Sequence, residues 1–283
     1  EEHTALSNDF SYIGRTCIEI SGGDRAGLHP ANHLVENNYF TRFGEIQKSY
    51  ATAVKLGAYT PGIGKEEGNA VGITVRNNLV HNAPHAAFIY GGNDNVLEYN
   101  EIFDIARLTG DVGAFYARWD WTSRGNVLRH NFVHHISRAN AFYGDDGHAG
   151  DSIYRNVVYR ALIGTLIGGG HANYIHNNLY VECLAAAIHL DSRGIQRNYN
   201  ASNPDFRDLF YAFKITDGAW DHRYPGISTF IFRDSLDYPQ DNDIADNIFI
   251  NCPVGIRKEG KEGDFRYSFF GKNDDRKLQD LDM

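Results

Sequence analysis

A repeated asparagine pattern constrains the fold of this 283-residue chain more than any other feature. Seven segments share an aliphatic residue, two variable residues, an asparagine and then an alternating apolar pair. The asparagines are Asn38, Asn78, Asn100, Asn131, Asn156, Asn178 and Asn247. Their intervals of 40, 22, 31, 25, 22 and 69 residues give a unit of 22 to 25 residues, with insertions or unrecognised units in the longer ones. Because asparagine is common in turns, one occurrence needs no explanation, but seven in one register indicate a repeat.

A second apolar strand follows each asparagine segment, and the two strands together point to a class of fold. Units of this length, with period-2 strands and few helix-capping residues, are too short for β-α-β crossovers, which need about 30 residues. They suit the rungs of a right-handed parallel β-helix, where each rung is stable only against its neighbours and the turn asparagines stack as an amide ladder. We therefore predict an all-β solenoid that forms a single β-helix domain over residues 1–283.

The positions five residues after the asparagines predict one inward column. They are all small or apolar: Phe43, Ala83, Ile105, Ile136, Ala161, Cys183 and Cys252. The three cysteines, including Cys17, have no metal-binding or redox spacing, so we interpret them as core thiols.

Period-2 alternation predicts which side chains of the second strands face solvent. We align these strands on Cys17, Ala53, Ala87, Ala114, Ala141, Thr165 and Ala187. One outward column then holds Tyr116, Tyr143 and His189, and the next holds Arg118, Asp145 and Asp191, with glycines at positions 57, 91 and 169. Glycine in a strand often marks the close approach of a ligand or another backbone. Aromatic faces beside carboxylates, with Trp119 and Trp121 continuing one rung, suit a sugar ring.

The two aspartates of the outer column suggest glycoside hydrolysis. Asp145 and Asp191 are two rungs apart, which places them about 9 to 10 Å from each other. Inverting glycosidases hold two carboxyls about 6.5 to 9.5 Å apart and retaining ones about 5 Å, so the spacing leans towards inversion. Asp146 can replace Asp145 in either role, raise its pKa as a neighbouring charge, or close the turn.

The elements GDDG, IGGGH, HLDSRG and RYP, within roughly residues 30 to 257, resemble bacterial right-handed β-helix proteins grouped near glycoside hydrolase family 141. That resemblance implies a secreted or periplasmic glycosidase with catalytic aspartates, acting on a plant or algal polysaccharide. It also implies a chain shorter at its N-terminus than its relatives. A looser similarity to polygalacturonase-like hydrolases implies catalytic elements in the order Asp120, Asp145 with Asp146, His171 and Arg193.

Two other classes of function stay open. A polysaccharide lyase could use Lys55 or Arg118 as the base, but the acidic outer column would repel a polyuronate unless calcium intervened. A non-catalytic carbohydrate-binding β-helix needs aromatic and polar groups but no paired acids. We expect no cofactor; calcium is possible in the stretch that holds Asp145, Asp146, His148 and Asp151, although it contains no fixed ligand spacing.

Residues 195–243 break the rung spacing, and we expect this insertion to wall the site. The polar segment 258–283 is expected to cap the last rung or to be partly mobile. The residues expected to contact substrate are Arg118, Tyr116, Trp119, Asp120, Tyr143, His148, His171, His189, Arg193, Trp220, His222, Arg223 and Tyr224.

The charge of the chain limits its partners. A formal net charge of -9 with no run of lysine or arginine argues against nucleic acid. No apolar stretch approaches the roughly 18 residues of a membrane span, and no signal peptide precedes Glu1. We expect a soluble monomer, processed or trimmed, whose partner is a carbohydrate.

Overall fold

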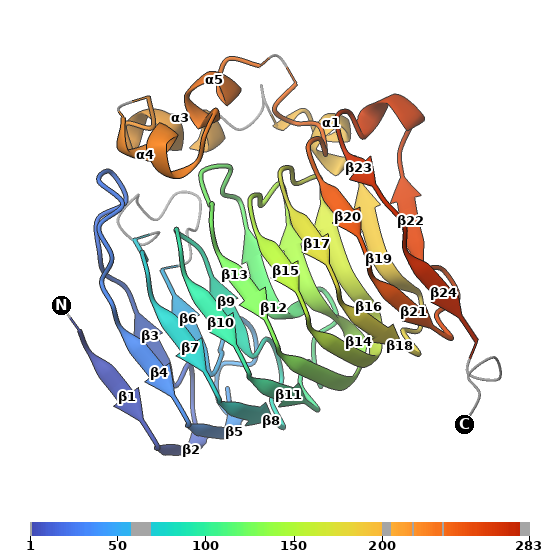
Figure 1. The fold of residues 1–283 in the computed structure, drawn as a ribbon. Helices are drawn as coiled ribbons and strands as arrows, with labels where there is room; N and C mark the ends of the chain where they lie inside the picture. Colours follow the sequence, from blue (N-terminus) through green and yellow to red (C-terminus); the bar gives the residue numbers. More distant parts are fainter. Residues whose placement is uncertain (1, 58–68, 200–204, 217, 234, 278–283) are drawn as a thin grey trace.

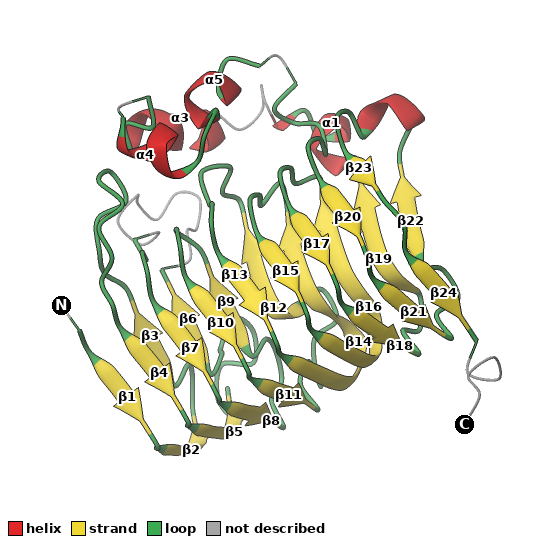
Figure 2. Ribbon diagram, viewed as in Figure 1, coloured by secondary structure: helices red, strands yellow, loops and turns green. Residues whose placement is uncertain are grey.

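The computed structural model describes residues 2–57, 69–199, 205–216, 218–233 and 235–277. Within these ranges the chain is mostly β, and all pairings between its strands are parallel. Figures 1 and 2 show the strands stacked in successive layers, with the helices gathered at one side of the stack. Parallel pairing of strands that recur along the chain agrees with the predicted repeat.

One sheet contains nine strands, which we call the first row. Its order is β1 (Thr4–Leu6), β4 (Leu34–Glu36), β7 (Thr74–Arg76), β10 (Val96–Glu98), β13 (Val127–Arg129), β15 (Ser152–Tyr154), β17 (Tyr174–His176), β20 (Asp243–Ala245) and β23 (Phe269–Phe270).

The other sheet contains fifteen strands and is curled into two rows, because two long strands pair on both sides of a bend. These long strands are β14 (Phe132–Asp145) and β16 (Val157–Gly168). The second row consists of β2 (Asp9–Ile13), β5 (Tyr39–Phe43), β8 (Leu79–His81), β11 (Glu101–Phe103), the first parts of β14 and β16, β18 (Leu179–Val181), β21 (Ile248–Ile250) and β24 (Asp274–Arg276). The third row consists of β3 (Ile18–Ile20), β6 (Val54–Leu56), β9 (Phe88–Tyr90), β12 (Gly113–Arg118), the last parts of β14 and β16, β19 (Ala186–Asp191) and β22 (Ile256–Glu259).

The predicted asparagine ladder is confirmed at the bend between the first and second rows. Each of the seven asparagines donates its Nδ2 to the Oδ1 of the next at 3.0 to 3.1 Å, and the ladder extends to Asn8 and Asn273 at its ends. The residue before each of the seven adopts a positive φ near +55°, which turns the chain sharply. Because the side-chain amides hydrogen-bond to one another, these polar residues can be buried at the bend.

A second ladder, which the repeat did not reveal, precedes the first row. Asn95, Asn126, Asp151, Asn173 and Asn242 are linked there by hydrogen bonds of 2.9 to 3.4 Å. Asp151, one of the residues considered for calcium, takes an asparagine's place in this ladder and is buried.

The inward column is confirmed as core. All seven of its residues are at most 3% exposed, and Cys183 and Cys252 are free buried thiols, whereas Cys17 is half-buried.

The predicted alignment of the second strands is correct at most rungs but wrong by one residue at β16. Thr165, not Leu166, lies in register with Phe142 and Ile188 in the interior. The hydroxyl of Thr165 is satisfied there by the hydroxyl of Tyr180 at 2.7 Å, so a polar residue is tolerated in the inward column. Leu166 therefore falls in the outward column instead.

The insertion at 195–243 consists of short helices and turns where the structure describes it, and β20 begins at its last residue. It contains α3 (Asp205–Ala212), α4 (Ala219–Arg223) and α5 (Ile227–Phe230), and α1 (Arg193–Gln196) leads into it. The helices share a separate hydrophobic cluster with Trp121, around the buried Trp220. Figure 1 shows α3, α4 and α5 over the turns at one end of the first-row strands. The insertion thus mainly covers these turns, and among the described helices it is α1 and the residue that follows it that line the cavity on the outer face of the third row.

The segment from residue 258 continues the stack as far as the structure describes it, to residue 277. Its 3-10 helix η2 (Glu262–Asp264) connects β22 to β23, and β23 and β24 pair with β20 and β21. These pairings extend the stack by further strands, and the role of this segment as a cap stays a prediction. In the described residues, no helix is long and apolar enough to cross a membrane.

Candidate active site

The outer face of the third row brings the two predicted aspartates into one column, two rungs apart. Arg118 pairs with Asp145, and Asp191 pairs with Gly168 on one side and Glu259 on the other. The corrected register therefore puts Gly168, rather than Gly169, between the two aspartates. A column of Arg118, Asp145, Gly168, Asp191 and Glu259 results.

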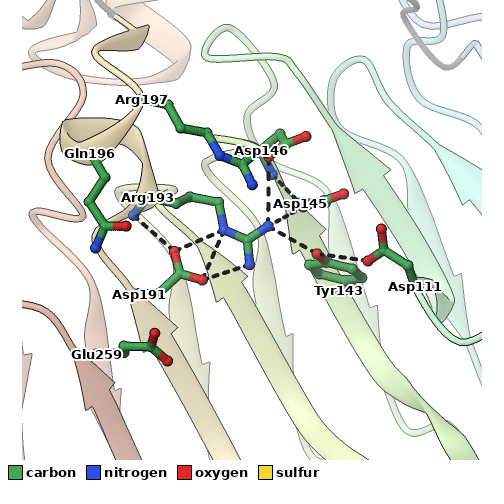
Figure 3. Close-up of a pocket in the computed structure, with 9 residues that line it drawn as sticks. All are labelled: Asp111, Tyr143, Asp145, Asp146, Asp191, Arg193, Gln196, Arg197 and Glu259. Atoms are coloured by element: carbon green, nitrogen blue, oxygen red, sulfur yellow. Dashed lines mark hydrogen bonds and ion pairs between the residues drawn. The ribbon is translucent and has the colours of Figure 1, made fainter.

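Gly168 leaves the space in which the guanidinium of Arg193 lies. A Cβ at Gly168 would be 2.8 to 2.9 Å from the Cζ, Nε and Nη1 atoms of Arg193. Arg193 begins α1, directly after β19, so its side chain folds back over the sheet (Figure 3). The close approach that glycine was expected to allow is made by a residue of this chain.

Arg193 bridges the two aspartates. Its Nη1 donates to Asp145 Oδ1 at 2.6 Å, while its Nη2 and Nε contact Asp191 at 2.6 to 3.0 Å. The backbone N–H of Arg193 also donates to Asp191 at 3.0 Å, and Nη1 donates to the hydroxyl of Tyr143 at 3.0 Å. The guanidinium thus makes a bidentate contact with Asp191 and a single hydrogen bond with Asp145.

A polar cavity of about 390 Å³ opens beside this bridge (Figure 3). Its lining consists of Asp111, Tyr143, Asp145, Asp146, Asp191, Arg193, Gln196, Arg197 and Glu259. Five carboxylates face two guanidiniums there, which makes the cavity a place for hydroxyl-rich or cationic ligands rather than polyanions.

Two tyrosines form the floor next to the acids, and both are more buried than predicted. Tyr116 and Tyr143 are 2% and 3% exposed, because their rings pack on each other at 5.4 Å and the Tyr50 ring covers that of Tyr116 at 6.4 Å. The hydroxyl of Tyr116 donates to Asp145 Oδ2 at 2.9 Å. Burial raises the pKa of both phenols, and the negative charge of Asp145 raises it further. Each is therefore a proton donor in a hydrogen bond at neutral pH.

Asp145 has the environment of a carboxylic acid that retains its proton more readily than usual. Burial raises its pKa, and the negative charge of Asp146 adds to that effect, whereas Tyr143, Arg193 and Tyr116 oppose it. Asp146 itself adopts a positive φ of 44° in the turn and is held by Arg197 at 2.6 Å and by the hydroxyl of Tyr199 at 2.7 Å. Asp146 therefore neighbours and tunes Asp145 while anchoring the start of the insertion.

Arg118 and His189 lie beside this site without lining the cavity. Arg118 donates to the hydroxyl of Tyr50 at 3.1 Å, and its guanidinium lies over that ring. His189, predicted to face solvent, is 8% exposed, and burial lowers its pKa. Its Nε2 lies 3.3 Å from Glu259.

Several other predicted contacts are instead structural. Asp120 pairs with Arg25 at 3.1 Å, His148 pairs with Asp151 at 3.1 Å, and His171 stacks on Phe230. Asp120, His148 and His171 are each at most 1% exposed. Trp220 is fully buried, with its Nε1 donating to the carbonyl oxygen of residue 25 at 2.8 Å. Trp119 packs on Phe206 in the cluster under the insertion. Burial of Asp120, His148, His171 and Trp220 disagrees with the expectation that they contact substrate, whereas Trp119 is half-buried and its contact with substrate stays a prediction.

The insertion residues expected at the site lie away from the cavity lining. His222 and Arg223 are exposed on α4, and Arg223 is paired with Asp94 at 2.8 Å. Tyr224 donates to the carbonyl oxygen of Arg124 at 3.3 Å. Arg223 and Tyr224 line a different cavity.

The four residues considered as calcium ligands do not converge. His148 and Asp151 pair with each other in the interior, while Asp145 and Asp146 face the arginines. Among the residues that the structure describes, no group of three or more His, Cys, Asp or Glu side chains could hold a metal ion.

Four residues of the cavity lining were missed by the sequence reasoning. They are Asp111, Gln196, Arg197 and Glu259. A signal existed for Glu259, because the strand after Asn247 can be aligned with the earlier ones and puts Glu259 in the column of Asp191. The others come from a loop and from α1, where strand alternation gives no guidance.

The sequence matches no protein-family model and no curated protein. A search of solved structures finds "The complex structure of XylC with xylose", with 13% sequence identity and a TM-score of 0.41. The match covers 88% of this chain and 48% of the other, so the chain spans about half the length of that protein.

Proposed function

We propose that this chain is a right-handed parallel β-helix that hydrolyses a glycosidic bond of a plant or algal polysaccharide or oligosaccharide outside the cell. The observation that carries the proposal is that Asp145 and Asp191 face one open polar cavity in two different environments. Pairs of carboxyl groups whose surroundings differ in this way divide the roles of acid and base in hydrolases. Relationship to glycoside hydrolase family 141 is part of the same proposal.

Asp145 is the proposed general acid. Its raised pKa, caused first by burial and then by Asp146, favours the protonated form that must donate to the glycosidic oxygen. Asp191 is the proposed base, which takes a proton from the water that attacks the anomeric carbon. The Nε and Nη2 of Arg193 donate to its oxygens at 2.6 to 3.0 Å and fix the orientation of the carboxylate.

Inversion of the anomeric configuration is part of the proposal. The backbones of the two acids are two rungs apart, about 9 to 10 Å, and both carboxyls contact the one guanidinium of Arg193, so the carboxyls lie closer together than the backbones do. Inverting glycosidases hold their two carboxyls about 6.5 to 9.5 Å apart, a range that begins well below the backbone spacing.

The test is a screen of the purified chain against polysaccharides and aryl glycosides, with NMR of the first-formed anomer. Hydrolysis with inversion is expected, with activity reduced at least a thousandfold in Asp145→Asn and Asp191→Asn. Asp243→Asn is a matched control, because this carboxylate lies on the first row and contacts His176. It should retain full activity.

Three outcomes would count against the proposal. An unsaturated product that absorbs in the ultraviolet would identify a lyase. Binding of the sugar without turnover would identify a non-catalytic module. Full activity of both asparagine variants would place the chemistry elsewhere on the chain.

A further inference from the structure

A second cavity, of about 510 Å³, lies between the insertion and the turns that precede the first row. Its charge is opposite to that of the acidic cavity: Arg124, Arg223 and Arg233 line it, and Asp241 is the one acidic residue of its lining. Tyr224 and Phe230 provide aromatic walls. In a chain of net charge -9, a cavity lined by three arginines is a local exception.

Arg124 is the residue of this cavity that most requires an explanation. It is 7% exposed, yet among the described residues no carboxylate lies within 4 Å of its guanidinium. Its Nη1 donates to the carbonyl oxygen of Ser123 at 2.7 Å, and its Nη2 lies 3.2 Å from Nε2 of His171. Burial lowers the pKa of Arg124 to about 10, so the guanidinium remains charged at neutral pH. Buried arginines are ordinarily paired with an acid.

The nearby acids are each engaged with another partner. Asp120 pairs with Arg25 at 3.1 Å, Asp151 with His148 at 3.1 Å, and Asp241 with Arg233 at 2.5 Å. Their charges reach Arg124 only over longer distances. The guanidinium is therefore short of an anion in direct contact.

The fold holds Arg124 in this place. Gly150, with φ of +82°, leaves room for the side chain, since a Cβ there would be 2.5 Å from Cδ and 2.9 Å from Nη1 of Arg124. Burial keeps the imidazole of His171 neutral by lowering its pKa well below the usual value, so its Nε2 can accept from Arg124 instead of repelling it. A side chain that is seated this closely and faces a cavity is already oriented to bind a ligand.

We propose that this cavity is an oxyanion-binding site, with Arg124 as its fixed donor and Arg233 and Arg223 at its rim. The ligand class is a carboxylate or sulfate group, either as an inorganic ion or as a substituent on an acidic saccharide. Guanidinium groups bind both through paired N–H donors. The aromatic walls add a surface for the apolar face of a sugar that carries the anion. The site does not depend on the proposed hydrolase.

The test uses isothermal titration calorimetry on the full chain with four probes: sodium sulfate, a uronic-acid disaccharide, a sulfated disaccharide and their neutral parent. The anionic probes should bind and the neutral parent should not, and the affinity should fall as salt rises. Tighter binding of an acidic saccharide than of sulfate would identify a sugar substituent as the ligand. Equal binding would identify the inorganic ion. Either result supports the site.

Variants separate this cavity from general electrostatic attraction. Arg233→Gln and Arg223→Gln remove exposed rim charges and should each weaken binding about tenfold, while Arg124→Gln should abolish it. Arg160→Gln is the matched control, because Arg160 forms an equally exposed ion pair with Glu182 on the second row. Binding that is equal for the neutral and anionic probes, or unchanged in the rim variants, would overturn the proposal. Asp145→Asn should bind the probes normally, so loss of hydrolysis and loss of this site are distinguishable.

Discussion

Replacing Arg193 with glutamine should show how strongly one guanidinium holds the acidic cavity together. The side chain makes four contacts with the two aspartates and a fifth with Tyr143. Removing one partner from a buried ion pair costs about 3 to 5 kcal/mol, because a charge is left uncompensated. The Arg193 side chain is 19% exposed, so we expect the lower end, about 3 kcal/mol of unfolding free energy at pH 8. In a chain of this size that lowers the melting temperature by about 6 to 12 °C.

The loss should depend on pH with a definite sign. Burial raises the pKa of Asp145 in the folded chain above its ordinary value, and removing the positive charge of Arg193 raises it further. A carboxyl of this kind takes up a proton on folding. Its contribution to stability is present below the unfolded pKa and is lost as pH rises through the folded pKa. The destabilisation by Arg193→Gln should therefore be smaller near pH 5 than at pH 8.

Urea unfolding of the wild type and of Arg193→Gln at the two pH values measures this difference. Adding Asp145→Asn to Arg193→Gln should recover part of the loss at pH 8, since it removes one unpaired charge. Arg160→Gln, in an exposed pair, should change the midpoint little at either pH. An equal loss at both pH values, or a larger one at pH 5, would refute the assignment of an uncompensated charge at Asp145.

Two further predictions concern the stack. Asn131→Ala, in the middle of the ladder, leaves buried donors and acceptors of its neighbours unsatisfied and should lower the free energy of unfolding in urea by about 3 kcal/mol. Asn8→Ala, at the exposed end of the ladder, should lower it much less. Equal losses would argue against a ladder that stabilises as a unit. Burial raises the pKa of Cys17 to about 12, and Cys183 and Cys252 are at most 2% exposed. A thiol reagent at neutral pH should therefore label none of the three rapidly in the folded chain and all three after unfolding. Mass spectrometry counts the labelled thiols.

The repeat in the fold could be predicted because its causes are local in sequence. Each ladder asparagine is preceded by a residue of positive φ and followed five residues later by a buried apolar residue, so the same pattern recurs along the sequence. The second ladder was not recognised, although its members lie five residues before first-ladder asparagines, because Asp151 replaces an asparagine in it. The helices of the insertion were not predicted either, since their cluster forms only against Trp121 on the stack.

The candidate site could be predicted only where strand alternation determines it. Asp145 and Asp191 were placed in one outward column because both lie on strands. The role of Arg193 depends on the direction in which the chain leaves β19, which alternation does not specify. Burial of Tyr116 and Tyr143 depends on loops that approach from other rungs, and sequence alternation distinguishes inward from outward but not covered from open.

The single-residue error at β16 shows how the stack and the site depend on each other. Leu166 is apolar, so alternation alone aligns it with the inward residues and places Gly169 in the acidic column. The inward position is in fact filled by Thr165, whose hydroxyl is satisfied by Tyr180 inside the stack. The register that places Thr165 in the interior also puts Gly168 between Asp145 and Asp191. Because a Cβ at Gly168 would lie 2.8 to 2.9 Å from the guanidinium of Arg193, this one-residue difference in register decides whether the acids on the surface can be bridged.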